Sequence, residues 1–261
     1  MRGPRCYNPA VFRQLRIAVV IPAFNEGNKI AATVASIPEF VDEIFVVDDA
    51  SSDETSSVAL AAFPPVTPGR VLEVVRHGDN RGVGAAIASG YRRVLAGEAD
   101  VAVVMAGDGQ MDPADLPALL APIADGDADY VKGNRFKHPD IWSAMPTTRI
   151  VGNVLLSAAT RVTSGYHHVF DSQCGYTAIH RRALSAIDLG VLWARYGYPN
   201  DLLSRLYVAG VRVVDVPVRP IYGDQWRSGI NFATALHPLP WVLLRSWSTR
   251  IAAQARRLAR G

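Results

Sequence analysis

The 261-residue sequence predicts an α/β fold in which a mostly parallel β-sheet carries helices on both faces. One observation is that short apolar runs alternate with helical segments throughout the first 135 residues. Another is that these runs are continuously apolar, which is typical of parallel strands buried on both faces. Apolar residues make up 49% of the chain and charged residues 20%, so it can bury a full core and is not disordered.

The first half contains five predicted strands with four helices between them. The strands are expected at 16–22, 43–49, 71–76, 100–106 and 128–133, and the helices at 27–37, 53–62, 82–97 and 112–123. The strands are rich in Val and Ile and are bounded by Pro, Asp or Gly. Ser51 or Ser52 is expected to cap the second helix, and Gly97 to end the third. Asp112 is expected to open the fourth helix, with Pro113 at its first position.

The second half is less regular. Helices are expected at 147–163, 181–187 and 200–210, and strands at 173–179 and 211–218. No internal repeat or low-complexity linker interrupts the chain. We therefore predict one domain over 16–222, an N-terminal extension over 1–15, and a basic C-terminal extension over 223–261.

The cysteines and the apolar runs bear on the cellular setting. Cys6 and Cys174 lie far apart, so they indicate neither a disulfide framework nor a zinc site. No apolar run reaches the roughly 18 residues of a membrane-spanning helix. The N-terminal segment has neither the apolar core nor the cleavage site of a signal peptide. A reduced, cytoplasmic setting is therefore expected.

The charge of the chain is uneven, although its net value is only +3. No acidic residue follows Asp224, whereas six arginines do. On a helical wheel one face of the tail carries Leu244, Trp247, Ile251, Ala255 and Leu258. The other face carries Arg245, Arg250, Arg256, Arg257 and Arg260. Such a basic amphipathic helix is typical of a membrane-surface element. The alternative is a helix docked on its own domain with a solvated basic face.

Polar residues gather where the predicted parallel strands end, and ligands of such sheets bind beyond those ends. The segment leaving the first strand comprises Pro22, Ala23, Phe24, Asn25 and Glu26. Asn25 and Glu26 are expected to contact a nucleobase or a ribose, with helix capping as the alternative. Asp48 and Asp49 end the second strand. Their mutual repulsion predicts a ribose hydroxyl, a base N–H or a metal beside them.

The third and fourth strands are followed by further candidates. Asp108 and Gln110 offer a carboxylate and an amide oxygen, and Mg²⁺ and Mn²⁺ prefer such ligands together with substrate phosphates. Asn80 and Gly82 lie in the run NRGVG, which is not a dinucleotide-binding GxGxxG motif because Ile87 takes the third glycine position. This turn is expected to open a helix and to face a nucleotide.

The second half supplies basic and amide side chains. Arg135 and Arg149 suit a phosphate, because a guanidinium can donate two parallel hydrogen bonds. The remaining candidates for carboxylate or amide roles are Asp171, Gln173, Asn200 and Asp201. His167 and His168 lack the spacing of metal ligands and are expected on a surface loop. Simple surface solvation is the alternative for each arginine.

Seven stretches of the chain carry a resemblance to a known family. They are VVIPAFNEGNKI (19–30), FVVDDASSDET (45–55), NRGVGAAIASG (80–90), VVMAGDGQMDPADLP (103–117), YVKGNRF (130–136), DSQCGYTAI (171–179) and GVRVVDVPV (210–218). In order and spacing they resemble family 2 glycosyltransferases of the GT-A fold. More narrowly, they resemble the branch containing dolichol-phosphate mannosyltransferases and bacterial polyprenyl-phosphate glycosyltransferases.

The resemblance implies inverting transfer of a hexose from a UDP- or GDP-linked donor to a polyprenyl or dolichyl phosphate at the cytoplasmic membrane face. Pro22, Phe24, Glu26 and Asp49 would line the base and ribose site. Asp108 and Gln110 would hold Mg²⁺ or Mn²⁺ against the donor diphosphate. The acceptor residues would be Arg135, Arg149 and Asn153, to which we add Gln173. A phosphate acceptor is already anionic, whereas a hydroxyl acceptor needs a base, for which Asp201 is the candidate.

One departure from the family pattern leaves alternatives open. Ala106 stands where the family has the first carboxylate of an Asp-x-Asp motif. The metal shell is then completed by Gln110 and donor phosphates, or metal affinity is lower, or the chain is a nucleotide-sugar-binding relative without turnover. A soluble or protein acceptor is another alternative, whereas the missing GxGxxG disfavours a nicotinamide oxidoreductase. Only the charge of the tail suggests nucleic acid, so none is expected, and no motif predicts the oligomeric state.

Overall fold

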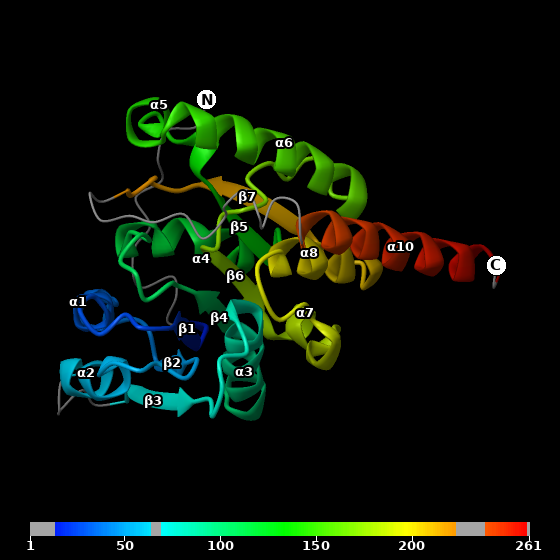
Figure 1. Cartoon of the computed structure of the whole chain (residues 1–261). Helices are drawn as coiled ribbons and strands as arrows, with labels where there is room; N and C mark the ends of the chain where they lie inside the picture. The colour runs from blue at the N-terminus through cyan, green and yellow to red at the C-terminus, as the bar shows by residue number, and fades with distance from the viewer. Residues whose placement is uncertain (1–13, 64–68, 223–237, 260–261) are drawn as a thin grey trace.

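The structure is a computed structural model, and it describes residues 14–63, 69–222 and 238–259. Its centre is a seven-stranded sheet with the strand order β3-β2-β1-β4-β6-β5-β7 (Figure 1). The strands are β1 (Ile17–Ala23), β2 (Glu43–Asp48), β3 (Val71–Arg76), β4 (Val101–Val104), β5 (Tyr130–Asn134), β6 (Thr177–His180) and β7 (Val213–Pro217).

The sheet is mostly parallel, as predicted. β1 pairs in parallel with β2 and β4, β2 with β3, and β5 with β7. β6 runs antiparallel to both of its neighbours, β4 and β5. This strand begins at Thr177 rather than at the predicted residue 173, because the preceding residues form a loop in which Asp171 binds Arg135.

Helices cover both faces of the sheet. They are α1 (Ile30–Ser36), α2 (Thr55–Ala62), α3 (Val83–Ala96), α4 (Leu116–Ala124), α5 (Ile141–Ala144), α6 (Thr147–Ser164), α7 (Arg181–Ser185), α8 (Tyr198–Val208) and α10 (Leu239–Leu258). Short 3₁₀ turns lie at Pro113–Asp115, Arg135–Lys137 and Leu189–Val191. Successive side chains of a strand point to opposite faces. Thus Val19 of β1 packs with α1 and α4, whereas Val20 packs with α3 and α8.

Two predicted helix starts had different outcomes. Asp112 caps the helical turn before α4, accepting a hydrogen bond from the Ala114 N–H at 2.9 Å, with Pro113 in the first turn as predicted. The predicted serine cap of α2 is wrong, because Glu54 is its N-cap residue and no side chain caps the helix. The Ser51 hydroxyl instead accepts a hydrogen bond from the Asn25 N–H at 2.9 Å.

The predicted tail helix is α10, which packs along α8 and α6 (Figure 1). Two arginines of its basic face, Arg245 and Arg250, are turned toward the domain, whereas Arg256 is exposed. Arg245 Nη2 donates to the Val191 carbonyl at 2.6 Å, and Arg250 Nη2 donates to the Val162 carbonyl at 3.0 Å. The apolar side chain of Trp247, by contrast, is exposed. The helix is therefore docked on its domain, as one of the two alternatives expected, but Arg245 and Arg250 contact the domain rather than solvent.

The domain division at 222 stays a prediction, and the extension over 1–15 lies almost wholly outside the described residues. Across the described parts of the chain, none of the helices combines the length and the apolar composition that crossing a bilayer requires.

Candidate active site

A cavity of about 430 Å³ lies beyond the carboxyl ends of β1, β2 and β4. Eight of the nine residues predicted to bind the donor line it: Pro22, Ala23, Phe24, Glu26, Asp49, Asn80, Gly82 and Asp108. They come from four separate loops, which the parallel strands bring to one edge of the sheet. Arg195 and Tyr196 also line the cavity, from the loop before α8. Neither was predicted, because that loop carries no motif that marks its position.

Asn25 is the predicted donor residue that does not line the cavity. Its side-chain oxygen accepts a hydrogen bond from the Ser52 N–H at 2.8 Å, and its φ of 55° lies in the left-handed region that Asn tolerates. Asn25 therefore ties the loop after β1 to the loop after β2 and shapes the cavity from outside.

The adjacent carboxylates Asp48 and Asp49 find their partners within the protein. Asp48 is buried and accepts hydrogen bonds from the Ser51 N–H at 2.8 Å and from the Ser56 hydroxyl. Burial acts to raise the pKa of Asp48, but the hydrogen bonds from Ser51 and Ser56 outweigh it and leave that pKa lowered. A metal or ribose is thus not needed to explain this pair of carboxylates.

Asp49 anchors the loop after β3 to the end of β2. Its two oxygens accept hydrogen bonds from the Arg81 N–H at 2.9 Å and the Gly82 N–H at 2.6 Å. One of them also lies 2.6 Å from His77 Nδ1. Gly82 has a φ of 96°, and a Cβ there would meet Arg195 at 2.6 Å, so glycine is required at this turn. These contacts fix the wall of the cavity formed by Asn80 and Gly82.

Two carboxylates share the floor of the cavity. Burial is the main factor that raises the pKa of Asp108, and burial together with the nearby Asp108 and Asp53 raises the pKa of Glu26. Lys29 opposes both shifts, with its Nζ 3.7 Å from Glu26 Oε2. A half-buried carboxylate with a raised pKa is a site where an added cation is favourable.

The fit to a divalent cation depends on the donor. No cluster of three or more His, Cys, Asp or Glu residues suited to a metal occurs among the residues that the structure describes. Asp108 offers its carboxylate, and Gln110 follows it with an amide oxygen. Hard cations take such oxygen ligands together with substrate phosphates. Asp108 and Gln110 thus fit Mg²⁺ or Mn²⁺ when a diphosphate supplies further oxygens, since Ala106 supplies none.

A second, smaller cavity of about 150 Å³ adjoins the first through Asp108, which lines both. Gln110, Arg135, Arg149 and Gln173, all predicted site residues, line this second cavity. Arg219 and Tyr222 line it too and were not predicted. The second cavity thus gathers three arginines beside the acidic floor of the first, which suits an anion larger than a single carboxylate.

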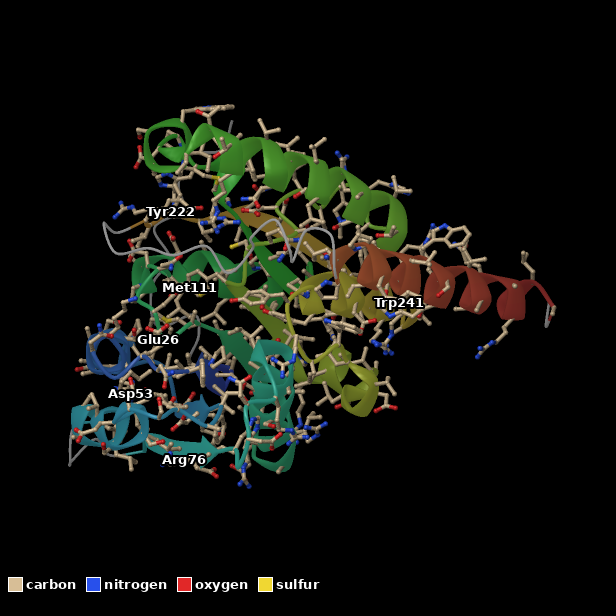
Figure 2. The ribbon with its side chains drawn as sticks, in the orientation of Figure 1. Glu26, Asp53, Arg76, Met111, Tyr222 and Trp241 are labelled. Carbon is tan, nitrogen blue, oxygen red and sulfur yellow. The ribbon has the colours of Figure 1, made fainter. Side chains whose placement is uncertain are left out.

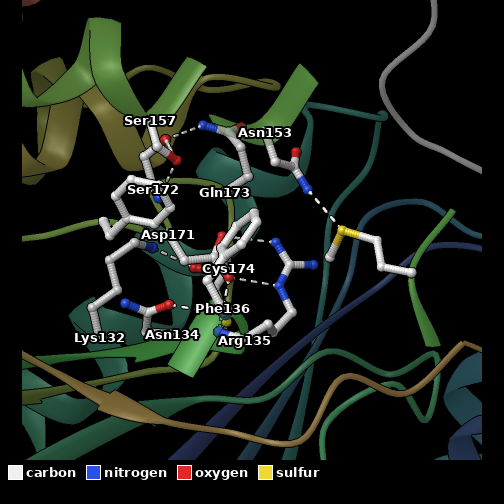
Figure 3. A network of polar contacts seen from close by, with 12 residues as sticks. Lys132, Asn134, Arg135, Phe136, Asn153, Ser157, Asp171, Ser172, Gln173 and Cys174 are labelled. Carbon is white, nitrogen blue, oxygen red and sulfur yellow. Dashed lines mark hydrogen bonds and ion pairs between the residues drawn. The ribbon is translucent and has the colours of Figure 1, made fainter. Parts of the chain in front are cut away.

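Arg135 is fixed by an ion pair with Asp171, which is fully buried (Figure 3). Burial acts against both charges, but their mutual attraction and hydrogen bonds dominate. The pKa of Arg135 is therefore raised and that of Asp171 lowered. The free edge of the guanidinium donates from Nη1 to the Tyr222 hydroxyl at 3.0 Å. The same Tyr222 ring lies 5.1 Å from the Arg149 guanidinium, in cation–π contact.

Two predicted acceptor residues differ in their placement. Gln173 lines the second cavity, and its Nε2 donates to the Ser172 hydroxyl at 2.8 Å and to Asn200 Oδ1 at 3.3 Å. Asn153 is buried on α6, one turn beyond Arg149, and its Nδ2 faces Met145 Sδ at 3.6 Å (Figure 3). Asn153 does not line the cavity and supports the helix that carries Arg149.

Asp201, the candidate base for a hydroxyl acceptor, lines neither cavity. It is fully buried and pairs with Arg205 at 2.8 Å and with Arg245 of α10 at 3.7 Å. It also accepts a hydrogen bond from the Trp193 N–H at 2.9 Å. These contacts attach α10 and the loop carrying Arg195 to α8, so the geometry gives Asp201 a structural role.

Comparison with known proteins identifies the class that this fold and site define. The model of glycosyl transferase family 2 matches residues 18–188, and the chain belongs to that family. This covers all the predicted donor residues and all the predicted acceptor residues.

Among individual relatives, the chain is 31% identical over 219 residues to the UDP-N-acetylglucosamine–dolichyl-phosphate N-acetylglucosaminyltransferase of Methanococcus voltae, spanning 80% of this chain and 86% of that protein. It is 30% identical over 242 residues to the undecaprenyl-phosphate mannosyltransferase of Micrococcus luteus, spanning 89% and 96%.

A solved structure of similar fold is the glucosyl-3-phosphoglycerate synthase of Mycobacterium tuberculosis in complex with UDP. It matches with a TM-score of 0.66 at 23% identity, over 95% of this chain and 87% of that one. The same enzyme has been solved with Mn²⁺, UDP-glucose and phosphoglyceric acid, and that structure matches with a TM-score of 0.63 at 24% identity, over 92% and 82%. The likeness confirms the predicted GT-A fold.

Proposed function

We propose that this glycosyltransferase moves a hexose from a UDP- or GDP-linked donor to a polyprenyl or dolichyl phosphate, with inversion, at the cytoplasmic face of a membrane. The observation that carries the proposal is the pair of cavities joined at Asp108. One is lined by the predicted donor residues, and the other by Arg135, Arg149 and Arg219. The names of the two relatives, both lipid-phosphate glycosyltransferases, favour the same acceptor class.

The chemistry follows from the charge of each cavity. A divalent cation bound at Asp108 and Gln110 would stabilise the negative charge that develops on the leaving nucleoside diphosphate. An acceptor phosphate in the second cavity is already anionic, so its oxygen attacks the anomeric carbon without a base. The bond from that carbon to the diphosphate breaks, and its electron pair leaves with the nucleoside diphosphate. Arg135 and Arg149 hold the attacking phosphate in place, and this positioning dominates catalysis.

The test is a transfer assay with three acceptors on the purified chain. UDP- and GDP-linked hexoses are supplied with Mn²⁺, and the acceptors are polyprenyl phosphate in detergent, the corresponding polyprenol, and 3-phosphoglycerate. Transfer to polyprenyl phosphate alone is expected, because only it combines a phosphate with a lipid. Transfer to 3-phosphoglycerate alone would show that the acceptor is a soluble phosphate and not a lipid phosphate. Donor binding without any transfer would favour the relative that binds a nucleotide sugar and lacks turnover.

The donor half is tested separately by calorimetry of UDP and GDP, with and without Mn²⁺. Asp108→Asn is expected to weaken the metal-dependent part of nucleotide binding about tenfold or more, because it removes the carboxylate ligand. The matched control is Asp188→Asn, at an exposed residue that lines neither cavity. Metal-dependent binding that is equally strong in Asp108→Asn would remove Asp108 from the cation site.

A further inference from the structure

Two exposed apolar stripes lie on neighbouring helices outside both cavities. The α6 stripe consists of Val151, Leu155, Ala158 and Val162, spaced by four, three and four residues, and all four are exposed. The α10 stripe consists of Trp241, Leu244, Trp247, Ile251 and Leu258, with exposed fractions from 39% to 85%. Such spacing places each set on one side of its helix. Several exposed apolar side chains on one side of a helix are a feature of interaction sites.

The structure connects the two stripes to each other and to the second cavity. Arg250 of α10 donates to the Thr163 carbonyl at 3.2 Å and to the Val162 carbonyl at 3.0 Å, which brings the end of the α6 stripe to the middle of α10. Figure 1 shows the two helices adjoining at this point. At the other end of α6, Arg149 lines the second cavity while Val151, two residues on, is exposed. One helix thus carries both a wall of the acceptor cavity and an apolar outer side.

The composition of these helices indicates what covers the stripes. No acidic residue occurs between Ile141 and Phe170 or after Asp224, whereas both segments contain arginines. Three of the four tryptophans in the described residues are exposed here, namely Trp142 at 76% on α5, and Trp241 and Trp247 on α10 (Trp241 is labelled in Figure 2). Tryptophan and arginine beside apolar side chains favour the interface of an anionic bilayer. Arg256 is exposed on α10, and a second copy would instead bring two such acid-free surfaces face to face, with no carboxylate from either helix to pair with this charge.

We infer that the α6 and α10 stripes together form the surface by which the protein binds an anionic lipid bilayer, with α6 holding the acceptor cavity at the depth of the lipid headgroups. This inference deepens the proposed function and rests on it for the role of the acceptor cavity. Binding of the protein to lipid vesicles can be measured without any catalytic activity. The sequence predicted only the tail helix as a membrane element, so the α6 stripe is the new half of the surface.

The experiment is co-sedimentation of the full chain with vesicles of phosphatidylcholine, with and without phosphatidylglycerol. The wild type is expected to bind only, or much more strongly, when phosphatidylglycerol is present. L155S/V162S on α6 and W247S/I251S on α10 are each expected to lower the partition coefficient about tenfold or more, because each removes two apolar side chains from the bilayer. L60S is the control, because Leu60 is 53% exposed on α2, which lies beside β3 at the edge of the sheet opposite to β7 (Figure 1).

Three outcomes would overturn the inference. They are binding unchanged in both stripe variants, binding lost equally in L60S, and a wild-type dimer in sedimentation velocity that L155S/V162S dissociates. The proposed function is kept distinct by assaying the same variants on polyprenyl phosphate in detergent. There the stripe variants should retain wild-type transfer, whereas absence of transfer by the wild type, with vesicle binding intact, would count against the acceptor class and not against the surface.

Discussion

Asp171 accepts three hydrogen bonds from Arg135, at 3.0 Å from its backbone N–H, 2.7 Å from Nε and 2.9 Å from Nη2. These bonds fix one edge of the guanidinium and leave Nη1 directed at the Tyr222 hydroxyl in the second cavity. An anion entering this cavity meets an arginine whose position is set before binding, so little side-chain entropy is lost. Asp171 is therefore a positioning residue for Arg135.

Replacing Asp171 by Asn tests this role. Asp171→Asn keeps the size of the side chain but leaves the Arg135 charge buried without its partner, which is expected to cost about 3 kcal/mol of stability. If Arg135 binds the acceptor phosphate, the acceptor KM should also rise about tenfold, while the donor KM stays within about twofold. Chemical unfolding and steady-state kinetics measure the two effects.

The control for Asp171→Asn is Asp140→Asn, because the Asp140 side chain is 60% exposed and its contact with His138 Nδ1 is 3.6 Å long. Exposed pairs contribute at most about 1 kcal/mol. A folded Asp171→Asn protein with an unchanged acceptor KM would show that Arg135 does not contact the acceptor.

The substitution Asp201→Asn tests whether Asp201 has a catalytic role or a structural one. Asp201→Asn can still accept the Trp193 N–H bond but loses its charge toward Arg205 and Arg245. We expect a loss of about 3 kcal/mol in unfolding free energy and a kcat within about threefold of the wild type. A general base would instead contribute about 10²-fold or more to the rate. A stable variant with such a rate loss would restore Asp201 as the base.

Stability at acid pH depends on Asp129, whose carboxylate accepts hydrogen bonds from Arg212 Nε at 3.0 Å and Arg182 Nε at 2.5 Å. Burial opposes the charge, but the bonds from Arg212 and Arg182 outweigh it and lower the pKa of Asp129 to about 2. A lowered pKa contributes stability above the unfolded value of 3.8, and this stability is lost as pH falls toward 2.

The corresponding prediction concerns Asp129→Asn. At neutral pH the substitution is expected to cost about 1 kcal/mol, a figure that allows for solvent screening of this partly exposed cluster. The difference between wild type and variant should shrink as pH is lowered from 5 to 3, because the wild-type carboxylate is increasingly protonated on unfolding. Denaturant titrations across this range measure it. A difference independent of pH would mean that shape, not charge, is what Asp129 contributes.

The sheet and the donor cavity could be predicted because buried parallel strands have a recognisable apolar pattern and end at a common edge. Each buried strand is a continuous apolar run, and the polar residue after it must lie at the shared edge of the sheet. The strand pattern alone therefore brings Asp49, Asn80 and Asp108 together. Arg195 could not be found this way. It reaches the cavity from a loop whose position is set by the Asp201–Trp193 contact, a pairing that no periodicity in the sequence indicates.

The sequence also did not predict which face of α10 contacts the domain. The helical wheel separated apolar residues from arginines correctly, but amphipathicity alone does not say which face meets the domain. Arg245 and Arg250 face inward because the backbone carbonyls of Val191 and Val162 accept their hydrogen bonds. The carboxylate of Asp201 also forms an ion pair with Arg245, at 3.7 Å. These partners lie in three other segments of the chain, so tertiary structure decides which arginines face the domain.

Gly90 and Gly152 provide matched Gly→Ala substitutions with opposite expected signs. At Gly90 of α3, an added Cβ would meet Val20 Cγ1 at 2.2 Å and Cγ2 at 3.0 Å, so α3 must move away from β1. At Gly152 of α6 no atom lies within 4 Å of an added Cβ. Alanine is favoured over glycine in a helix interior by about 1 kcal/mol. Gly152→Ala is therefore expected to stabilise the protein by about that amount, whereas Gly90→Ala should destabilise it by about 2 kcal/mol.

Denaturant unfolding of the two variants measures these changes, and nucleotide binding reports the consequence for the site. Because α3 begins at Val83, directly after the Asn80–Gly82 wall, a shift of α3 is expected to weaken UDP or GDP binding in Gly90→Ala and to leave Gly152→Ala unaffected. A Gly90→Ala protein as stable as the wild type, with unchanged nucleotide affinity, would mean that Val20 moves aside at no cost. The close approach of α3 to β1 would then not determine the shape of the donor cavity.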